Sequence, residues 1–138
     1  MSIKDASGLP RFTITNTDVF EEPLGSIEEL DRYIGMLEFD TEQFLVVVSQ
    51  TAIDNCNFLQ AAGPPPPQQS KGWFRKPAPP RPDFTVEIQF GQAPSRRQYR
   101  YNTTDLEEVR RMFHAFIDEV VPVTTGWEDV THELFGNG

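Results

Sequence analysis

The chain has 138 residues, which suits a single domain with one core, and its formal net charge is −9. Its hydrophobic content of 38% includes eleven Phe, two Trp and three Tyr, which excludes a disordered chain despite the twelve prolines. The acidity argues against a nucleic-acid binder, because clustered Lys and Arg supply most of the affinity for phosphate.

The first predicted elements are a strand and a helix. Residues 11–15 alternate apolar and polar side chains and are rich in β-forming residues, so they predict a strand. Ser26 and Glu29 have the spacing of a capping box, which predicts the start of a helix. The apolar stripe that this helix would bury consists of Ile27, Leu30, Ile34 and Leu37.

Four further strands are predicted in two hairpins. Residues 44–48 are a continuous apolar run typical of a central strand, and the turn-forming residues 54–55 connect it to a strand over 56–62. Residues 84–90 alternate strictly, with four apolar side chains on one face. A turn then leads to a returning strand over 97–101.

A second helix follows the last of these strands. Thr104 and Glu107 resemble another capping box, with Thr103 and Asp105 as rival caps, and Pro122 is expected to end the helix. The apolar face of this helix consists of Leu106, Val109, Phe113, Phe116, Ile117 and Val120.

Two helices with one-sided apolar stripes require a sheet face on which to pack. We therefore predict an α+β fold, a two-layer sandwich in which two helices cover one face of an antiparallel sheet of four or five strands. The whole chain, 1–138, is expected to form one domain, with flexible termini over 1–10 and 130–138. Residues 63–83 are predicted to be a long Pro-rich loop between two strands.

This Pro-rich segment has two interpretations. Four consecutive prolines start a polyproline II rod, and residues 76–82 have the form of a polyproline II ligand that binds an aromatic groove. Trp73 and Phe74 lie between the two proline runs, among Lys and Arg residues. The segment is either a stiff connector or a loop whose aromatic tip contacts a partner.

The sequence offers little for catalysis or ligand binding. His114 and His132 are the only imidazoles, and His114 falls on the surface or boundary of the second helix. The single cysteine, Cys56, excludes an internal disulfide and is expected to be a buried thiol. Metal-binding and phosphate-binding motifs are missing. We therefore expect no catalytic, cofactor-binding or metal-binding residues, and no enzyme activity.

The segment 1–8 lacks the apolar core of a signal peptide, and the sequence has no apolar run of the about 18 residues that a spanning helix requires. These two features predict a cytoplasmic protein without a membrane partner.

Charge is unevenly distributed along the chain. Residues 1–60 have a net charge of −8, residues 61–100 of +5 and residues 101–138 of −6. The acidic segments favour a cationic protein partner, although any one carboxylate is more simply interpreted as a solvated charge. The candidate partner-binding residues are the acids Asp18, Glu21, Glu22, Asp40, Glu42 and Glu87 and the aromatic pair Trp73 and Phe74.

Taken in order, these elements resemble small immunity proteins of bacterial polymorphic-toxin systems, in particular the family associated with deaminase toxins. The resemblance is carried by the early helix Ser26-Ile27-Glu28-Glu29-Leu30-Asp31, the strands 44–48 and 84–90, and the late helix that starts at Asp105-Leu106-Glu107-Glu108-Val109 and is followed by Pro122 and Trp127. It implies a non-catalytic inhibitor that binds its cognate toxin and occludes the active site. A general interaction module that uses the Pro-rich loop is the alternative, and the oligomeric state stays open.

Overall fold

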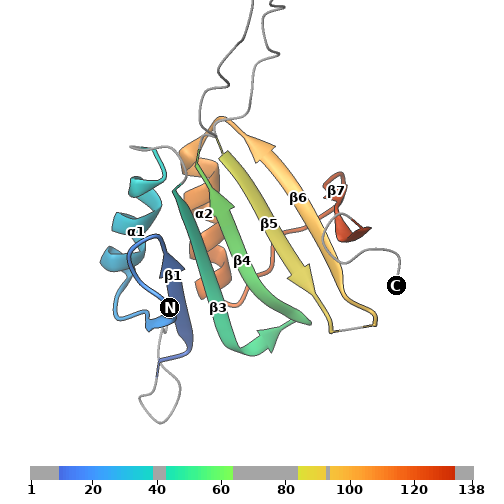
Figure 1. Ribbon diagram of the computed structural model, residues 1–138, viewed down its shortest axis with the longest axis horizontal. Coiled ribbons are helices and arrows are strands. Elements are labelled where there is room, and N and C mark those ends of the chain that lie inside the picture. Colours follow the sequence, from blue (N-terminus) through green and yellow to red (C-terminus); the bar gives the residue numbers. More distant parts are fainter. Residues whose placement is uncertain (1–9, 39–42, 64–83, 93, 133–138) are drawn as a thin grey trace, which may run out of the picture.

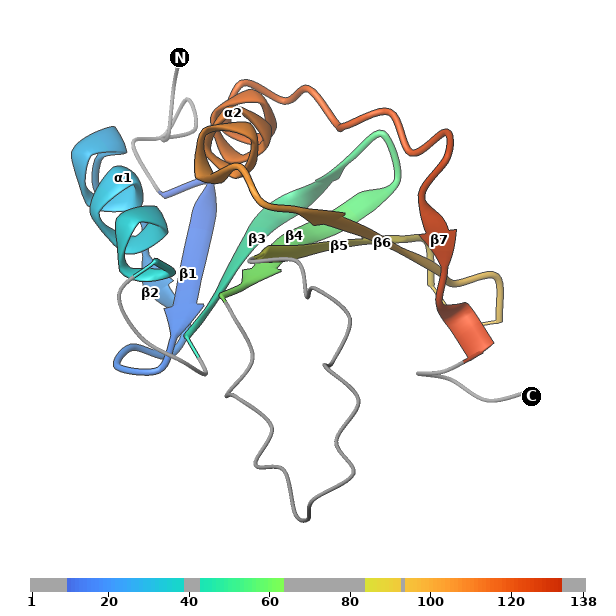
Figure 2. The same cartoon turned by 90° about the horizontal axis from the view of Figure 1, so that it is seen from above.

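The computed structural model describes residues 10–38, 43–63, 84–92 and 94–132, which form one antiparallel sheet and two helices (Figure 1). The elements are the strands β1 (Phe12–Asn16), β2 (Glu22–Pro23), β3 (Phe44–Ile53), β4 (Cys56–Ala62), β5 (Phe84–Phe90), β6 (Arg97–Thr103) and β7 (Glu128–Asp129) and the helices α1 (Ile27–Met36) and α2 (Leu106–Ile117). The strand order is β2-β1-β3-β4-β5-β6-β7. Both helices lie on the same side of this sheet, so the predicted α+β class is confirmed (Figure 2).

The prediction of four or five strands is wrong, because the sheet has seven. The two additional strands, β2 and β7, are the edges of the sheet, and each contains only two residues. A two-residue strand is too short to show the alternation by which strands are recognised in a sequence. β2 also contains Pro23, which is tolerated in an edge strand because its missing N–H is not needed by a further neighbour.

The core lies between the sheet and the helices. The predicted alternation of β5 is confirmed, because its residues Phe84, Val86 and Ile88 are buried while Thr85 and Glu87 are on the other face. Cross-strand pairs extend this buried face over the four central strands. The side chains that fill it from the strands and the helices include Phe12, Ile14, Leu30, Ile34, Leu45, Val47, Leu59, Val109, Phe113, Phe116 and Ile117.

Both helix starts are capped, α1 by the predicted Ser26 and α2 by Asp105 in place of Thr104 of the predicted capping box. The backbone N–H of Glu29 donates to the hydroxyl of Ser26 at 3.1 Å. Of the rival caps of α2, Asp105 is the one observed, and its carboxylate accepts a hydrogen bond from the N–H of Glu107 at 2.9 Å. Each cap satisfies an amide that has no partner within its helix, and this fixes where the helix begins.

α2 ends at Ile117, so the expectation that Pro122 ends the helix is wrong. Glu119 adopts a φ of 65°, and the N–H of Val120 donates back to the carbonyl of Ala115 at 2.8 Å. This is a Schellman motif, in which a left-handed residue closes the helix. Val120, expected on the buried stripe, lies beyond this turn and is 56% exposed.

The start of the expected flexible tail is packed on the sheet. Val130 is buried, and its N–H donates to the carbonyl of Gln98 at 2.9 Å. The hydroxyl of Thr131 accepts the N–H of Gln98 at 3.0 Å. Residues 1–9, 64–83 and 133–138, which contain the other segments expected to be flexible or Pro-rich, lie outside the described residues. Neither α1 nor α2 has the length and apolar character needed to cross a membrane.

Cys56 is buried at the start of β4, as expected for a structural thiol. Burial, the largest cause, raises its pKa to about 12. The thiol is therefore protonated at neutral pH and is a poor nucleophile.

Candidate partner-binding surface

The loop between β1 and β2, residues 17–21, is held in one conformation by the last residue of β1. The buried side chain of Asn16 accepts hydrogen bonds from the N–H groups of Asp18 at 2.8 Å and Val19 at 2.9 Å. The N–H of Asn16 donates to the carbonyl of Val19 at 2.9 Å. Val19 also packs against the core. The loop is therefore ordered by buried contacts before any partner binds.

Glu21 lies at the end of this loop with a φ of 50°. Left-handed backbone costs a residue with a side chain about 1–2 kcal/mol, so contacts must hold it in place. One such contact is the hydrogen bond from the N–H of Glu21 to the hydroxyl of Thr15 at 2.9 Å. At the other end of the loop, the hydroxyl of Thr17 donates to the side-chain carbonyl of Gln43 at 3.0 Å, which connects the loop to the start of β3.

The ordered loop and β2 display three of the predicted acids. Asp18, Glu21 and Glu22 are all exposed, and among the described residues no Lys or Arg forms an ion pair with them. The surrounding segment 12–38 contains seven Asp or Glu and one Lys or Arg. The negative charge of this edge of the molecule is thus largely uncompensated by neighbours in the sequence. We call residues 17–22 the acidic loop.

Glu87 does not belong to this acidic surface. It is on β5, its side chain is 14% exposed, and it lies 3.5 Å from Nε of Arg100. It also accepts a hydrogen bond from Nε2 of Gln98 at 2.7 Å. Glu87, a candidate partner-binding acid, is therefore paired within the sheet, because β6 places Arg100 directly opposite it. The remaining predicted residues, Asp40, Glu42, Trp73 and Phe74, lie outside the described residues.

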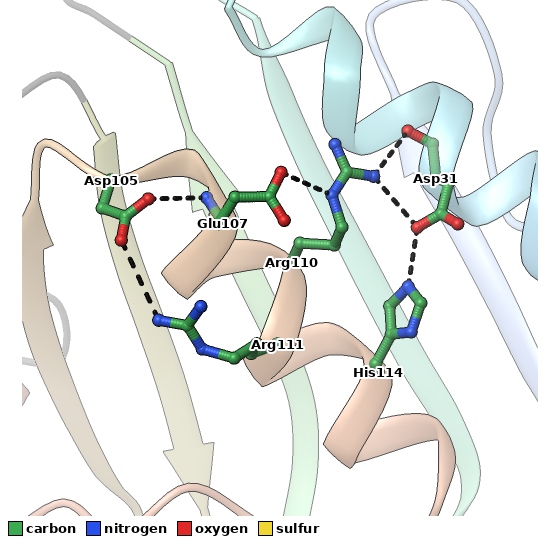
Figure 3. A network of polar contacts seen from close by, with 6 residues as sticks. All are labelled: Asp31, Asp105, Glu107, Arg110, Arg111 and His114. Carbon is green, nitrogen blue, oxygen red and sulfur yellow. Dashed lines mark hydrogen bonds and ion pairs between the residues drawn. The ribbon is translucent and has the colours of Figure 1, made fainter.

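A polar network connects the two helices, and sequence reasoning missed it (Figure 3). Oδ1 of Asp31, on α1, lies 3.0 Å from NH1 of Arg110 and 2.6 Å from Nε2 of His114, both on α2. Nε of Arg110 donates to Glu107 at 3.2 Å. Asp31 and His114 are 83 positions apart, and neither lies in a motif that could have indicated the contact.

The network shifts the titration of Asp31. Partial burial alone would raise the pKa of Asp31, but the hydrogen bonds from His114 and Arg110 outweigh this effect and lower it below its ordinary value. His114 is 32% exposed, as expected for a boundary histidine. Asp31 therefore joins the two helices through its hydrogen bonds with Arg110 and His114, in which charged groups take part.

Comparison with protein-family models, with curated proteins and with solved structures finds no match to this chain. In the described ranges, no three His, Cys, Asp or Glu side chains are close enough to hold a metal ion together. Function must therefore be inferred from the surface of the described residues.

Proposed function

We propose that this protein is a non-catalytic inhibitor of the immunity-protein type, which binds a cationic toxin domain through an acidic surface that includes the acidic loop. The single observation that carries this proposal is the position of Asp18, Glu21 and Glu22, exposed and without ion pairs among the described residues, on a loop whose backbone is fixed by Asn16 and Thr15.

The fixed conformation of the acidic loop should increase its affinity for a partner. A loop that is already in its binding conformation loses little conformational entropy when a partner binds, so more of the interaction energy appears as affinity. A binding residue held in left-handed backbone, as Glu21 is, has the kind of local strain that functional segments often contain. Both features support a recognition role for the acidic loop.

The mechanism of inhibition is steric. Toxins that act on nucleic acid need a basic cleft to hold phosphate, and an acidic surface complements such a cleft. Opposite potentials accelerate the encounter by about 10-fold to 1000-fold over that of uncharged surfaces. The bound inhibitor then occupies the cleft and excludes the substrate, without turnover.

The alternative function is that of a general interaction module that binds a partner through the Pro-rich segment. Residues 76–82 carry the sequence pattern of a polyproline II ligand, and this pattern favours a groove-bearing partner. The two functions use different parts of the chain, and they can be separated by substitution.

The experiment is growth of cells that express a candidate cationic toxin domain, beginning with any that a neighbouring gene encodes, with and without this protein. We expect wild-type protein to protect the cells and to be recovered in a complex with the toxin. The double reversal Glu21→Lys and Glu22→Lys should reduce the association rate about tenfold at low ionic strength, and less at 0.15 M salt, where charges are screened beyond about 8 Å.

A matched control reverses two exposed acids elsewhere, Asp118→Lys and Glu128→Lys, which changes the net charge equally. Glu108 is not a suitable control, because its carboxylate accepts a hydrogen bond from the hydroxyl of Tyr101 at 3.0 Å. Equal slowing by both double reversals would mean that only total charge matters. Cell death in the presence of wild-type protein, with no complex, would contradict the proposed function.

A further inference from the structure

The face of the sheet opposite the helices is divided into a polar half and an apolar half. Cross-strand rows run from β1 to β6 through Thr15, Val46, Gln60, Glu87 and Arg100. A parallel row runs through Thr13, Val48, Phe58, Gln89 and Gln98. In both rows the residues of β5 and β6 are polar, whereas most of those of β3 and β4 are apolar.

Several side chains of the polar half are hydrogen-bonded to one another. Gln98 donates to Glu87 at 2.7 Å and accepts a hydrogen bond from Gln89 at 3.2 Å. Thr85 donates to Asn102 at 3.0 Å. These hydrogen bonds connect β5 to β6 and account for the polar residues on this half of the face.

The side chains of the apolar half cannot form such hydrogen bonds with one another. Its side chains are Phe44, Val46 and Val48 on β3 and Phe58 and Ala62 on β4. Phe44 is 37% exposed, and the others retain partial exposure. The uncovered face of an antiparallel sheet is normally polar, and neither helix lies on this face (Figure 2). Phe44 and its partly exposed apolar neighbours are therefore a candidate interaction site.

The acidic loop borders this apolar half. Thr15, whose hydroxyl accepts the N–H of Glu21, is paired with Val46 across β1 and β3. Thr17 is hydrogen-bonded to Gln43, which directly precedes Phe44. The loop also carries Phe20, which is 76% exposed. Carboxylates and exposed aromatic side chains therefore meet at one end of the sheet.

We propose that the apolar half of this face, with Phe20, is the centre of the partner-binding surface, and that the acidic loop is its rim. This inference rests on the proposed function and deepens it, since it adds an apolar contact to the electrostatic one. Interfaces commonly bury an apolar centre inside a charged or polar rim, and a few large side chains at the centre carry most of the affinity.

The negative charge of the rim determines which kind of molecule can bind to this face of the sheet. The rim carries Asp18, Glu21 and Glu22, which repel phosphate and attract Lys and Arg. The partner is therefore a protein whose apolar contact residues are bordered by Lys and Arg. A mixture of apolar and basic residues is more typical of the mouth of a basic cleft than of its floor.

The test is selection of a displayed library of random twelve-residue peptides on immobilised full-length protein. We expect the selected peptides to combine Lys or Arg with large apolar residues. They should bind the variant Phe44→Thr with Val48→Thr at least about 30-fold more weakly than wild type, the size of effect that defines an interface hot spot. Thr keeps the β-propensity of the two positions. Phe20→Ser should weaken binding as well, while leaving the sheet unchanged.

Three results would overturn this inference: selection of no binder, selection of peptides without positive charge, or equal binding to the variants and wild type. A clear loss of thermal stability in the Phe44→Thr, Val48→Thr protein would also contradict it, because the face would then be covered by the chain itself, for instance by residues 64–83.

Failure of this inference is distinguishable from failure of the proposed function. If the Phe44→Thr, Val48→Thr protein still protects cells from the toxin while Glu21→Lys with Glu22→Lys does not, the function stands and the apolar centre is wrong. If wild-type protein gives no protection, the proposed function fails, whereas the peptide selection still reports on the surface.

Discussion

Nε2 of His114 lies 2.6 Å from Oδ1 of Asp31, and this contact joins two helices that are separated in the sequence by four strands. Oδ1 of Asp31 also accepts a hydrogen bond from NH1 of Arg110 at 3.0 Å, so two donors from α2 share one carboxylate oxygen. The apolar stripes of the helices determine that both pack on the sheet, and this polar contact determines how the exposed sides of the helices are aligned.

Asp31→Asn should lower the free energy of unfolding by about 1 kcal/mol, the size expected for partly exposed charged pairs that solvent screens. Urea unfolding at pH 7 measures this difference. Asp118→Asn, which removes an exposed acid outside the network, is the control and should have an effect of less than about 0.5 kcal/mol. Equal effects of the two substitutions would show that the network does not stabilise the fold.

The contribution of Asp31 should depend on pH in a defined direction. Its pKa in the folded protein is lower than in the unfolded chain, where it is about 3.9, so the stabilisation is complete above that value and is lost as pH falls through the folded pKa. The difference in stability between wild type and Asp31→Asn should therefore shrink as the pH falls below about 4. A difference that grows as the pH falls below about 4 would contradict this assignment.

Phe113→Ala should lower the free energy of unfolding by about 3–5 kcal/mol. Phe113 is fully buried where α2 meets the sheet, and its removal would leave a cavity that the packed neighbours cannot fill. Thermal and urea unfolding measure the loss. Arg111→Ala on the same helix, where the side chain is 69% exposed, should change stability by less than about 0.5 kcal/mol. Unchanged stability of Phe113→Ala would remove the basis of the two-layer packing.

Glu119→Gly should raise the free energy of unfolding by about 0.5–1 kcal/mol, because glycine adopts the observed φ of 65° without the steric cost that glutamate has. The substitution also removes the surface ion pair with Arg11, which offsets part of the gain. Asp118→Gly is the matched control: its φ is −84°, so glycine there should destabilise the protein. A loss of stability in Glu119→Gly larger than in Asp118→Gly would show that the ion pair dominates.

The order of the main elements could be predicted because each leaves a local pattern. The strict alternation of β5 and the stripe of α1 each repeat several times within their element, and the caps Ser26 and Asp105 mark helix starts directly. These signals are set by the chain's own backbone periodicity and hydrogen-bonding needs, which do not depend on distant residues.

The missed features depend on contacts between distant segments. β2 and β7 exist only because neighbouring strands offer them hydrogen bonds, and Glu87 is neutralised only because β6 returns Arg100 to it. The end of α2 at Ile117 also escaped prediction, because a left-handed glutamate at 119 closed the helix where a glycine would have been recognisable. The acidic character of residues 18–22 was visible in the sequence, whereas the ordering of this loop by Asn16 was not.

Replacement of residues 64–82 by a short Gly/Ser loop should leave thermal stability and toxin binding nearly unchanged, because the entropy of loop closure varies slowly with length. The substitutions Trp73→Ala and Phe74→Ala in the otherwise unchanged chain should likewise preserve binding. If these variants fold but no longer bind the partner, the Pro-rich segment is the binding element, and the general interaction module becomes the better account of function.

Titration of the toxin's activity with this protein tests the central claim most directly. A stoichiometric inhibitor that binds tightly lowers the residual activity linearly, reaching zero at about one equivalent, and the inhibited fraction does not change with time of incubation. We predict this result for wild-type protein with the toxin domain that it protects cells against, and a weaker, salt-sensitive inhibition for Glu21→Lys with Glu22→Lys. Full activity in the presence of excess protein, or progressive inactivation by much less than one equivalent, would contradict an inhibitor that acts by binding alone.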